Sequence, residues 1–295
     1  SPQAEAALAH LTSAARAASQ NRMPEVMPNL AKAAMFLEAI VYNVPLDVYR
    51  ERFGGESVAA KRFYNIGGGE NWYHPCWTVL DTHLIHDDAG IRMDFTDGSP
   101  WPIDNESAEI VYTSHCLEHL DHSSLEHVLA EACRILKSGG LIRVVVPDID
   151  IYLNAYNRRD NNYFTYINDN SGQYGAHSLA QNLLCQFAYP LSAHCEKTPQ
   201  LHMSDDEVEK IFAENPPEQA LDQCLARIPA DFRDPSHPHV NWLNAAKLER
   251  LLEMAGFVDI SRSASGQSRE TVLCDLACFD YTAPEVSLYM EARKP

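Results

Sequence analysis

Short apolar runs separated by polar turns fill the middle of the chain and predict the strands of a sheet. Phe63 to Ile66 is the first run, and three consecutive glycines follow it; Trp77 to Asp81 is the second. Runs of this length, bounded by turn residues, are typical of buried strands. Three further strands are predicted at Ile91–Asp94, Glu109–Thr113 and Leu141–Val146.

Apolar residues at helical spacing lie before and after these runs. Residues from about 4 to 53 are predicted to be helical. After the fourth strand, Ser123 and Glu126 have the spacing of a capping box, and the helix they open is expected to end at Gly139 and Gly140. Strands that alternate with helices predict an α/β fold with a doubly wound, mostly parallel sheet, whose ligands bind at the carboxyl ends of the strands.

The charge of the chain limits its partners. With 23 basic and 41 acidic residues, the net charge is −18, which repels phosphate backbones and argues against nucleic acid as a partner. No apolar run has the length of a bilayer span, so no membrane partner is expected. The eight cysteines form neither a C-x-x-C pair nor a disulfide framework, which favours a reduced, cytoplasmic protein.

The segment SHCLEHL after the fourth strand contains an H-x-x-E-H motif formed by His115, Glu118 and His119. This spacing is that of inverted zinc peptidases, in which two histidines bind zinc and the glutamate activates water. Such a site needs the motif within one long helix, whereas a new helix start follows immediately at Asp121-His122-Ser123. A zinc hydrolase therefore stays an alternative, and we favour a place in the floor of a cofactor pocket.

The glycine turn narrows the choice of cofactor. A dinucleotide fingerprint would need a glycine where the chain has Trp72. Glycines let the backbone pass close to a ligand. Asp81, at the end of the second strand, is placed to accept hydrogen bonds from both hydroxyls of a ribose. Asp94, followed by Phe95, is placed to accept an adenine amino proton beside an apolar cover.

In this order, these segments resemble the core of class I S-adenosylmethionine-dependent methyltransferases of the type with LEH after strand four. The resembling pieces are NIGGGE (65–70), VLD (79–81), residues 93–120, residues 131–148, and a later block at 237–260 followed by a final strand at 287–293. The resemblance implies a seven-stranded Rossmann-like sheet and S-adenosylmethionine as cofactor. The expected cofactor contacts are Asn65, Gly67, Gly68, Gly69, Asp81, Thr82, Asp94, Phe95, His115 and Leu117.

The resemblance also divides the chain into four parts. Residues 1–61 are a helical cap or a segment that forms a homodimer, 62–147 the cofactor-binding core, 148–236 a helical lid that binds the acceptor, and 237–295 the rest of the core. One departure is Asn65, since the family usually has an acidic residue at this position. An amide can still form hydrogen bonds there. A cofactor-binding protein without catalysis is therefore an alternative.

The lid sequence suggests the kind of acceptor. It is rich in tyrosine and asparagine and contains Arg158 and Arg159, which suits a small polar or anionic molecule such as an amino acid, a thioether, a sugar or a carboxylated metabolite. Transfer to oxygen, nitrogen or sulfur needs mainly alignment in a closed pocket, and a base only where the acceptor loses a proton. The candidate catalytic residues are His115, Tyr152, Tyr156, His177, His194 and His239.

No metal ion is expected for the favoured function, but one alternative is a methyltransferase that uses a divalent metal ion. Some RNA-end methyltransferases that the chain resembles use E-x-x-E-H together with a distant histidine. The corresponding metal-assisted methyltransferase would bind a divalent ion through His115, Glu118 and His119 with His239 or His237.

Overall fold

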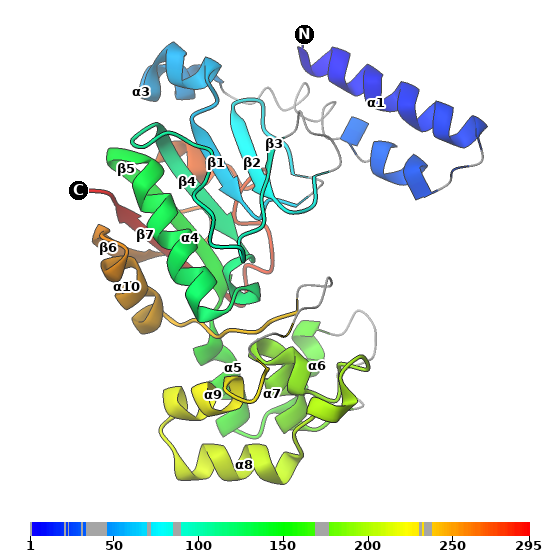
Figure 1. Cartoon of the computed structure of the whole chain (residues 1–295), viewed down its shortest axis with the longest axis vertical. Helices are drawn as coiled ribbons and strands as arrows, with labels where there is room; N and C mark the ends of the chain where they lie inside the picture. Colours follow the sequence, from blue (N-terminus) through cyan, green and yellow to red (C-terminus); the bar gives the residue numbers. More distant parts are fainter. Residues whose placement is uncertain are drawn as a thin grey trace.

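The computed structural model describes most of the chain, and Figure 1 shows a sheet domain with a helical insertion beneath it. The described residues are 2–20, 22, 24–30, 32–33, 46–69, 72–84, 90–168, 177–229, 232 and 238–295. The predicted α/β class is confirmed.

The sheet has seven strands in the order β3-β2-β1-β4-β5-β7-β6. β1 to β5 run parallel, and β7 is antiparallel to both of its neighbours. The strands are β1 Phe63–Ile66, β2 Trp77–Asp81, β3 Gly90–Arg92, β4 Ala108–Ser114, β5 Leu136–Pro147, β6 Val258–Ser263 and β7 Ser287–Arg293. All five predicted strands of the core are present, and the final strand has the predicted bounds. The strand order reverses between β1 and β4, so a ligand is expected at the carboxyl ends of these two strands.

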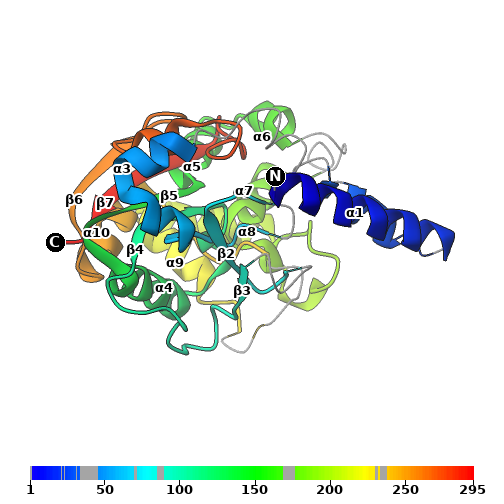
Figure 2. The ribbon, with the colours of Figure 1, turned by 90° about the horizontal axis from the view of Figure 1, so that it is seen from above.

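Helices cover both faces of the sheet, as Figure 2 shows. On one face, α4 (His122–Ile135) and α10 (Ala245–Met254) pack on a core that includes Val111. On the other face lie α3 (Leu46–Ala59) and the turn η5 (Thr271–Cys274), packed against Tyr112. Successive residues of a strand point to opposite faces, so β4 contributes to both cores.

The expected ends of α4 are wrong. The N-cap is Asp121, whose side chain accepts a hydrogen bond from the backbone N–H of Ser124, so no capping box forms at Ser123. A carboxylate at the N-cap satisfies a free N–H and also interacts favourably with the helix dipole. The helix ends at Ile135, before the two glycines, because Leu136 already has extended backbone and begins β5.

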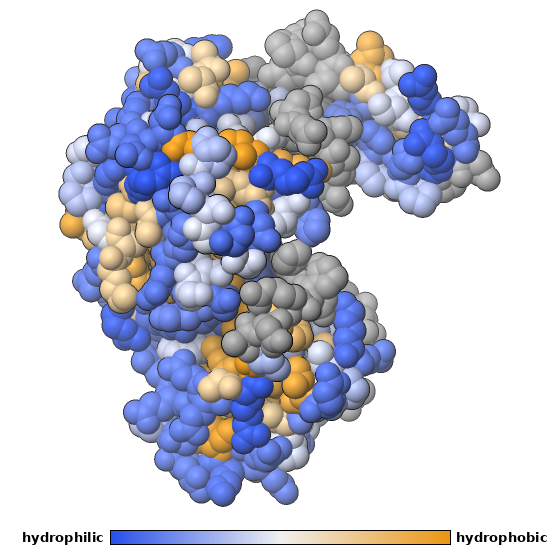
Figure 3. Space-filling model, in the orientation of Figure 1, coloured by the Kyte–Doolittle hydropathy of each residue, from blue (hydrophilic) through white to orange (hydrophobic). Residues whose placement is uncertain are grey.

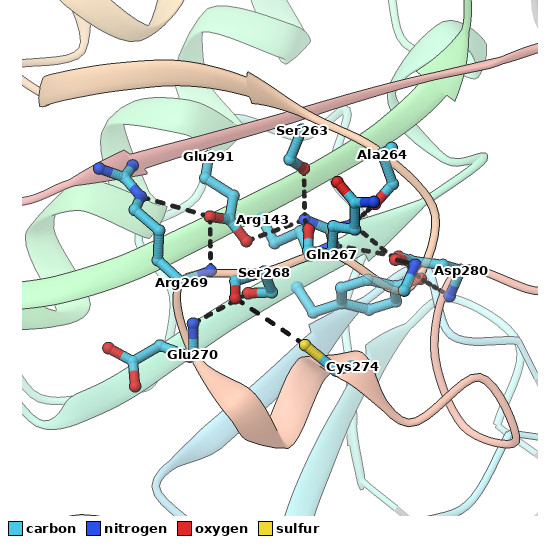
Figure 4. A network of polar contacts seen from close by, with 12 residues as sticks. Arg143, Ser263, Ala264, Gln267, Ser268, Arg269, Glu270, Cys274, Asp280 and Glu291 are labelled. Carbon is cyan, nitrogen blue, oxygen red and sulfur yellow. Dashed lines mark hydrogen bonds and ion pairs between the residues drawn. The ribbon is translucent and has the colours of Figure 1, made fainter.

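A buried ion network joins β5 to the chain that follows β6 (Figure 4). The Arg143 side chain is fully buried and donates to Asp280 Oδ1 and Oδ2 and to Glu291 Oε1, at 3.1, 2.5 and 2.8 Å. It also donates to Ser263 Oγ and to two backbone carbonyl oxygens, those of Ala264 and Gln267. Because these partners lie on β6, on β7 and between the two strands, the network ties the β6–β7 segment to β5.

The insertion forms a helical unit with its own apolar core, to which Phe164, Leu183 and Phe187 contribute. The elements are α5 Ile149–Asn157, α6 Asn161–Asn168, α7 Leu179–Phe187, η3 Tyr189–Leu191, η4 Pro199–Leu201, α8 Asp205–Glu214 and α9 Pro217–Leu225.

Most of the described residues of the N-terminal segment are helical, as predicted. α1 spans Pro2–Ser19, and residues 24–30 and 32–33 are also helical. The apolar residues expected to form a cap or a dimer face (Met35, Phe36, Leu37, Ile40 and Val41) lie outside the described residues. All eight cysteines are free thiols. Within the described ranges, no helix is long and apolar enough to cross a membrane.

Candidate active site

The glycine loop after β1 is closely packed. Gly67 has a φ of 68°, and a Cβ there would lie 2.3 Å from the Cys116 sulfur. A Cβ on Gly68 would lie 2.7 Å from Nδ2 of Asn65. Real Cβ atoms do not approach other atoms this closely, so a side chain at either position would displace the loop. Gly69 also has a positive φ, but a Cβ there would meet open space.

Asp81 links this loop to the end of β2. Its Oδ2 accepts a hydrogen bond from the Gly69 N–H at 2.8 Å, and its Oδ1 accepts one from the His83 N–H at 2.7 Å. A carboxylate oxygen can accept more than one hydrogen bond. The carboxylate therefore holds the loop in place and still offers acceptor capacity to a ligand.

A cavity of about 490 Å³ lies over the ends of these strands. Seven of the ten expected cofactor contacts line it: Gly67, Gly69, Asp81, Thr82, Asp94, Phe95 and His115. Its other lining residues are His83, Thr96, Cys116, His119 and Leu120. The last three belong to the SHCLEHL segment, for which the sequence favoured a place in the floor of the pocket, whereas the only signal for His83 and Thr96 is that each lies close to a predicted contact.

Three expected contacts lie elsewhere. Asn65 is buried beneath the glycine loop, and its Oδ1 has no hydrogen-bond partner among the described residues. Gly68 faces that amide, and Leu117 is fully buried in the main core. Trp101 is buried and packs against Phe95, with the two ring centroids 6.0 Å apart.

The cavity suits S-adenosylmethionine in size and in chemistry. Small-molecule sites commonly enclose about 300–1,000 Å³. The cavity is lined by glycine backbone, which would hold the amino acid, by Asp81, which would hold the ribose, and by Asp94 and Phe95, which would hold the adenine. Asp94 Oδ1 already accepts hydrogen bonds from the N–H and hydroxyl of Thr96, which fixes its orientation.

A second, larger cavity of about 1130 Å³ adjoins the first at the boundary between the sheet and the insertion. Figure 3 shows apolar side chains over the insertion just below this boundary. Four residues line both cavities: Thr82, Asp94, Thr96 and His119. Its wall also includes Glu218 and Asp222 of α9, Lys247 and Arg250 of α10, and Trp242.

Lys247 is a feature that the sequence gave no reason to expect. It is buried, its Nζ donates to Asn241 Oδ1 at 2.9 Å, and the same Nζ lies 3.9 Å from the centroid of the Trp242 ring. Burial lowers the pKa of Lys247 to about 8. Trp242 Nε1 donates to Asp222 Oδ1 at 2.8 Å, so α9, α10 and the segment before α10 are joined at this wall.

Of the six candidate catalytic residues, only His115 is among the residues that line either cavity. Tyr152 and Tyr156 are buried in the core of the insertion. The rings of His177 and His194 lie 3.9 Å apart, and His194 Nε2 contacts Asn182 Oδ1 at 2.8 Å. Burial, reinforced by His177, lowers the pKa of His194 to about 4.

The residues of the H-x-x-E-H motif converge on a single carboxylate. From Glu118 Oε1, the distances are 3.4 Å to His115 Nδ1, 3.8 Å to His119 Nε2 and 3.9 Å to His239 Nε2. Burial lowers the pKa of His239 and so favours its neutral form. His237, the other candidate, lies outside the described residues.

This arrangement is not that of the inverted zinc peptidases. Leu117–His119 form a single 3-10 turn, η1, and His115 precedes it with a φ of 51°. α4 starts only at His122. The two histidines of the motif therefore do not share the face of one long helix.

Comparison with known proteins gives one family and many distant structures. Residues 82–144 match the model of a family described as a methyltransferase domain. No curated protein matches the chain.

Among solved structures, the chain is similar to a methyltransferase of Thermotoga maritima described as a possible histamine N-methyltransferase (13% identity, 79% of this chain, 82% of that one, TM-score 0.37). It is also similar to a methyltransferase of Archaeoglobus fulgidus (13%, 88% and 99%, 0.35). A third is human N-acetylserotonin methyltransferase in complex with S-adenosylmethionine (15%, 90% and 55%, 0.36). Values this low carry no inference about the acceptor.

The family match spans the chain from the end of β2 into β5, which contains most of the smaller cavity's lining. It lies within a mostly parallel seven-stranded sheet, the arrangement implied by the sequence resemblance. Residues 82–144 therefore belong to a methyltransferase domain, in a fold of the class I, S-adenosylmethionine-dependent type.

Proposed function

We propose that this methyltransferase acts on a small polar acceptor, which binds in the larger cavity and meets the cofactor where the two cavities join. The observation that carries this proposal is the set of four residues common to both cavities, Thr82, Asp94, Thr96 and His119. A molecule in the larger cavity has direct access to the smaller one through this junction.

The charges on the wall of the larger cavity favour an acceptor with polar or charged groups. Glu218 and Asp222 supply negative charge, and Lys247 and Arg250 supply positive charge. An amino acid or a carboxylated metabolite fits this mixture best, with a sugar or a thioether as the other acceptors of the same size. The arginines predicted to attract an anion point elsewhere: Arg159 pairs with Glu209 at 2.6 Å, and Arg158 lies 4.0 Å from Asp160, all on the surface.

The role of the protein follows from the chemistry of the donor. S-adenosylmethionine supplies a methyl group on a sulfonium, whose departure leaves a neutral thioether. The chain must then align the acceptor and exclude water, which proximity and enclosure achieve. Where the acceptor has to lose a proton, His119 of the metal-free protein is the group in position to take it, because it lies at the junction with Nε2 3.8 Å from the Glu118 carboxylate.

Calorimetric titration with S-adenosylmethionine and S-adenosylhomocysteine tests the first half of this proposal. We expect one site per chain with micromolar affinity for both. Acceptors are then screened by class for transfer of a labelled methyl group, with amino acids and carboxylated metabolites first. Absence of binding in protein that is folded by circular dichroism would refute the proposal, and transfer only to large apolar acceptors would refute the acceptor class.

We also propose that the N-terminal helices join two copies of the chain. Leu8, Leu11, Met27 and Leu30 are exposed apolar residues on α1 and on the helical residues 24–30. Light scattering should give twice the mass of one chain, and L11E with M27E should give a single chain. A monomeric wild-type protein would exclude this role.

A further inference from the structure

Glu118 is a buried carboxylate without a hydrogen bond. It is 2% exposed, and neither of its carboxylate oxygens accepts a hydrogen bond from any described residue. A buried charge is costly unless it is paired, or coordinates a metal. The nearest candidates for a partner are the imidazoles of His115, His119 and His239, each within 3.9 Å of Oε1.

The hydrogen bonds of His239 determine which of its nitrogens carries the proton. Its Nδ1 lies 2.9 Å from the backbone oxygen of Gln186. A carbonyl oxygen can only accept, so Nδ1 is protonated. In neutral imidazole the other nitrogen, Nε2, is then a bare acceptor, and this is the atom that faces Glu118.

The same reasoning applies to His115. Its Nε2 lies 2.8 Å from Ser287 Oγ, and that hydroxyl lies 2.7 Å from the backbone oxygen of Ala283. The single hydroxyl proton of Ser287 is needed for the carbonyl, so His115 Nε2 must donate to Ser287. Its Nδ1 is then also an acceptor that faces Glu118.

His115 Nδ1 and His239 Nε2 are thus acceptor nitrogens that face the Glu118 carboxylate. The lone pairs of these three groups repel one another unless a positive charge lies among them. Histidines that bind a metal ion usually donate through one ring nitrogen to a carbonyl, hydroxyl or carboxylate and bind the ion through the other nitrogen. His119 Nδ1 is buried and has no hydrogen-bond partner among the described residues, so this ring can also bind a metal ion. Its ring packs against that of His239, with centroids 4.8 Å apart.

We infer that Glu118, His119 and His239 bind a divalent first-row transition metal ion, with His115 as a fourth ligand. Candidate ligand atoms of the first three lie within 4.8 Å of one another. With metal–ligand bonds of about 2.1 Å, tetrahedral ligands are roughly 3.4 Å apart, so small side-chain rotations are sufficient to close the site. Imidazole ligands with one carboxylate favour Zn²⁺ or a neighbouring ion over Mg²⁺ or Ca²⁺.

The place of this cluster suggests its use. His119 lines both cavities, so an ion held beside it would lie at the junction and could bind a polar group of the acceptor. This role rests on the proposed function, whereas the binding of the ion does not. Metal affinity is therefore measured without cofactor or acceptor.

The test uses untagged protein that has been dialysed against a chelator and then titrated with Zn²⁺ and with Co²⁺. We expect one ion per chain by elemental analysis, a visible ligand-field absorption for the Co²⁺ form, and a higher melting temperature in the presence of Zn²⁺. Less than one-tenth of an equivalent of either ion in folded protein would overturn the inference, and a protonated histidine would then be the partner of Glu118.

Variants determine whether the ion occupies this cluster. We expect Glu118→Gln and His239→Asn to weaken binding at least about a hundredfold, since even outer partners of a metal ligand are worth 10–100-fold. His119→Asn, whose side chain is partly exposed, tests the site if the buried variants do not fold. His127→Asn is the control, because His127 is a partly exposed α4 residue that lies outside the cluster and contacts Ser99. Unchanged affinity in the cluster variants would show adventitious binding and refute the site.

Titration of the same metal-free protein with S-adenosylmethionine separates this inference from the proposed function. Cofactor binding without metal binding would refute only the metal site. Metal binding without cofactor binding would leave the site in place and refute the proposed function.

Discussion

Replacement of Arg143 by methionine is expected to destabilise the fold strongly. The substitution keeps much of the side-chain volume but removes three hydrogen bonds to carboxylates and three to neutral oxygens. Glu291 keeps a cationic neighbour, since Arg269 Nε lies 3.3 Å from its Oε2. Asp280 keeps only the Gly266 N–H and the more distant Tyr112 hydroxyl in the described structure, so its charge stays buried without a counterion.

The magnitude follows from these contacts. Removal of one partner of a buried ion pair costs about 3–5 kcal/mol. Natural domains are stable by only about 5–15 kcal/mol, so the loss should be plain in a urea titration. Trp77 is a useful fluorescent reporter, because its ring lies 5.0 Å from that of Phe279, the residue before Asp280.

Two further variants separate charge from shape. Arg143→Lys keeps the positive charge but replaces the planar fork by a single ammonium group, so we expect a smaller loss. Asp280→Asn in the methionine background removes the unpaired charge and should restore part of the stability. A loss below about 1 kcal/mol for Arg143→Met, or no recovery in the double variant, would refute the assignment of this network as an anchor of the β6–β7 segment.

The glycine loop, Asp81 and Lys247 give three more predictions. Gly67→Ala should lower the affinity for S-adenosylmethionine at least tenfold and Gly69→Ala less, because only the former meets the Cys116 sulfur; equal calorimetric effects would contradict this. Asp81→Asn should weaken cofactor binding by about 10–150-fold, the value of a charged hydrogen bond of about 1.5–3 kcal/mol, whereas exposed Asp97→Asn should not. The pKa of Lys247 is lowered to about 8, so above this pH the unfolded chain holds a proton that the native chain has lost. The free energy of unfolding, measured in urea, should therefore rise between pH 8 and about 10.4, by on the order of 1–3 kcal/mol more in the wild type than in Lys247→Met. If the two proteins differ by the same free energy at every pH, burial does not lower the pKa of Lys247.

The sheet could be predicted from the sequence because its signals are local. Each core strand is a short apolar run bounded by polar or glycine residues, and β7 has the bounds expected for it. The ends of α4 were less predictable, because Asp121 and Ser123 are both good N-caps and only the course of the chain selects between them. The extent of β5 depends in the same way on its partner strands, since Leu136 pairs with Ala108 of β4.

The sequence predicted only those residues of the site that lie directly at the carboxyl ends of the strands. Gly67, Asp81 and Asp94 lie at the ends of consecutive strands, so their meeting follows from the parallel order. Tyr152 and Tyr156 had the right chemistry for an acceptor site, but they pack in the insertion's own core, which residue type alone does not reveal. The larger cavity is lined by residues from α9, α10 and the β3–α4 region, whose proximity no local pattern indicates.

The Glu118 cluster shows that the residue types of a motif can form a site even where the backbone geometry implied by their spacing is absent. The H-x-x-E-H spacing alone fits a helix with two histidines on one face, an alternative that the helix start at Asp121 already argued against. The structure has a 3-10 turn there, and the glutamate lies at the centre of the cluster. Its partners are fixed from distant parts of the chain: the insertion provides the Gln186 carbonyl that orients His239, and the first residue of β7 orients His115. Because β5 and the Arg143 network hold β7 in place, the stability of the far side of the sheet and the orientation of this cluster depend on the same strand.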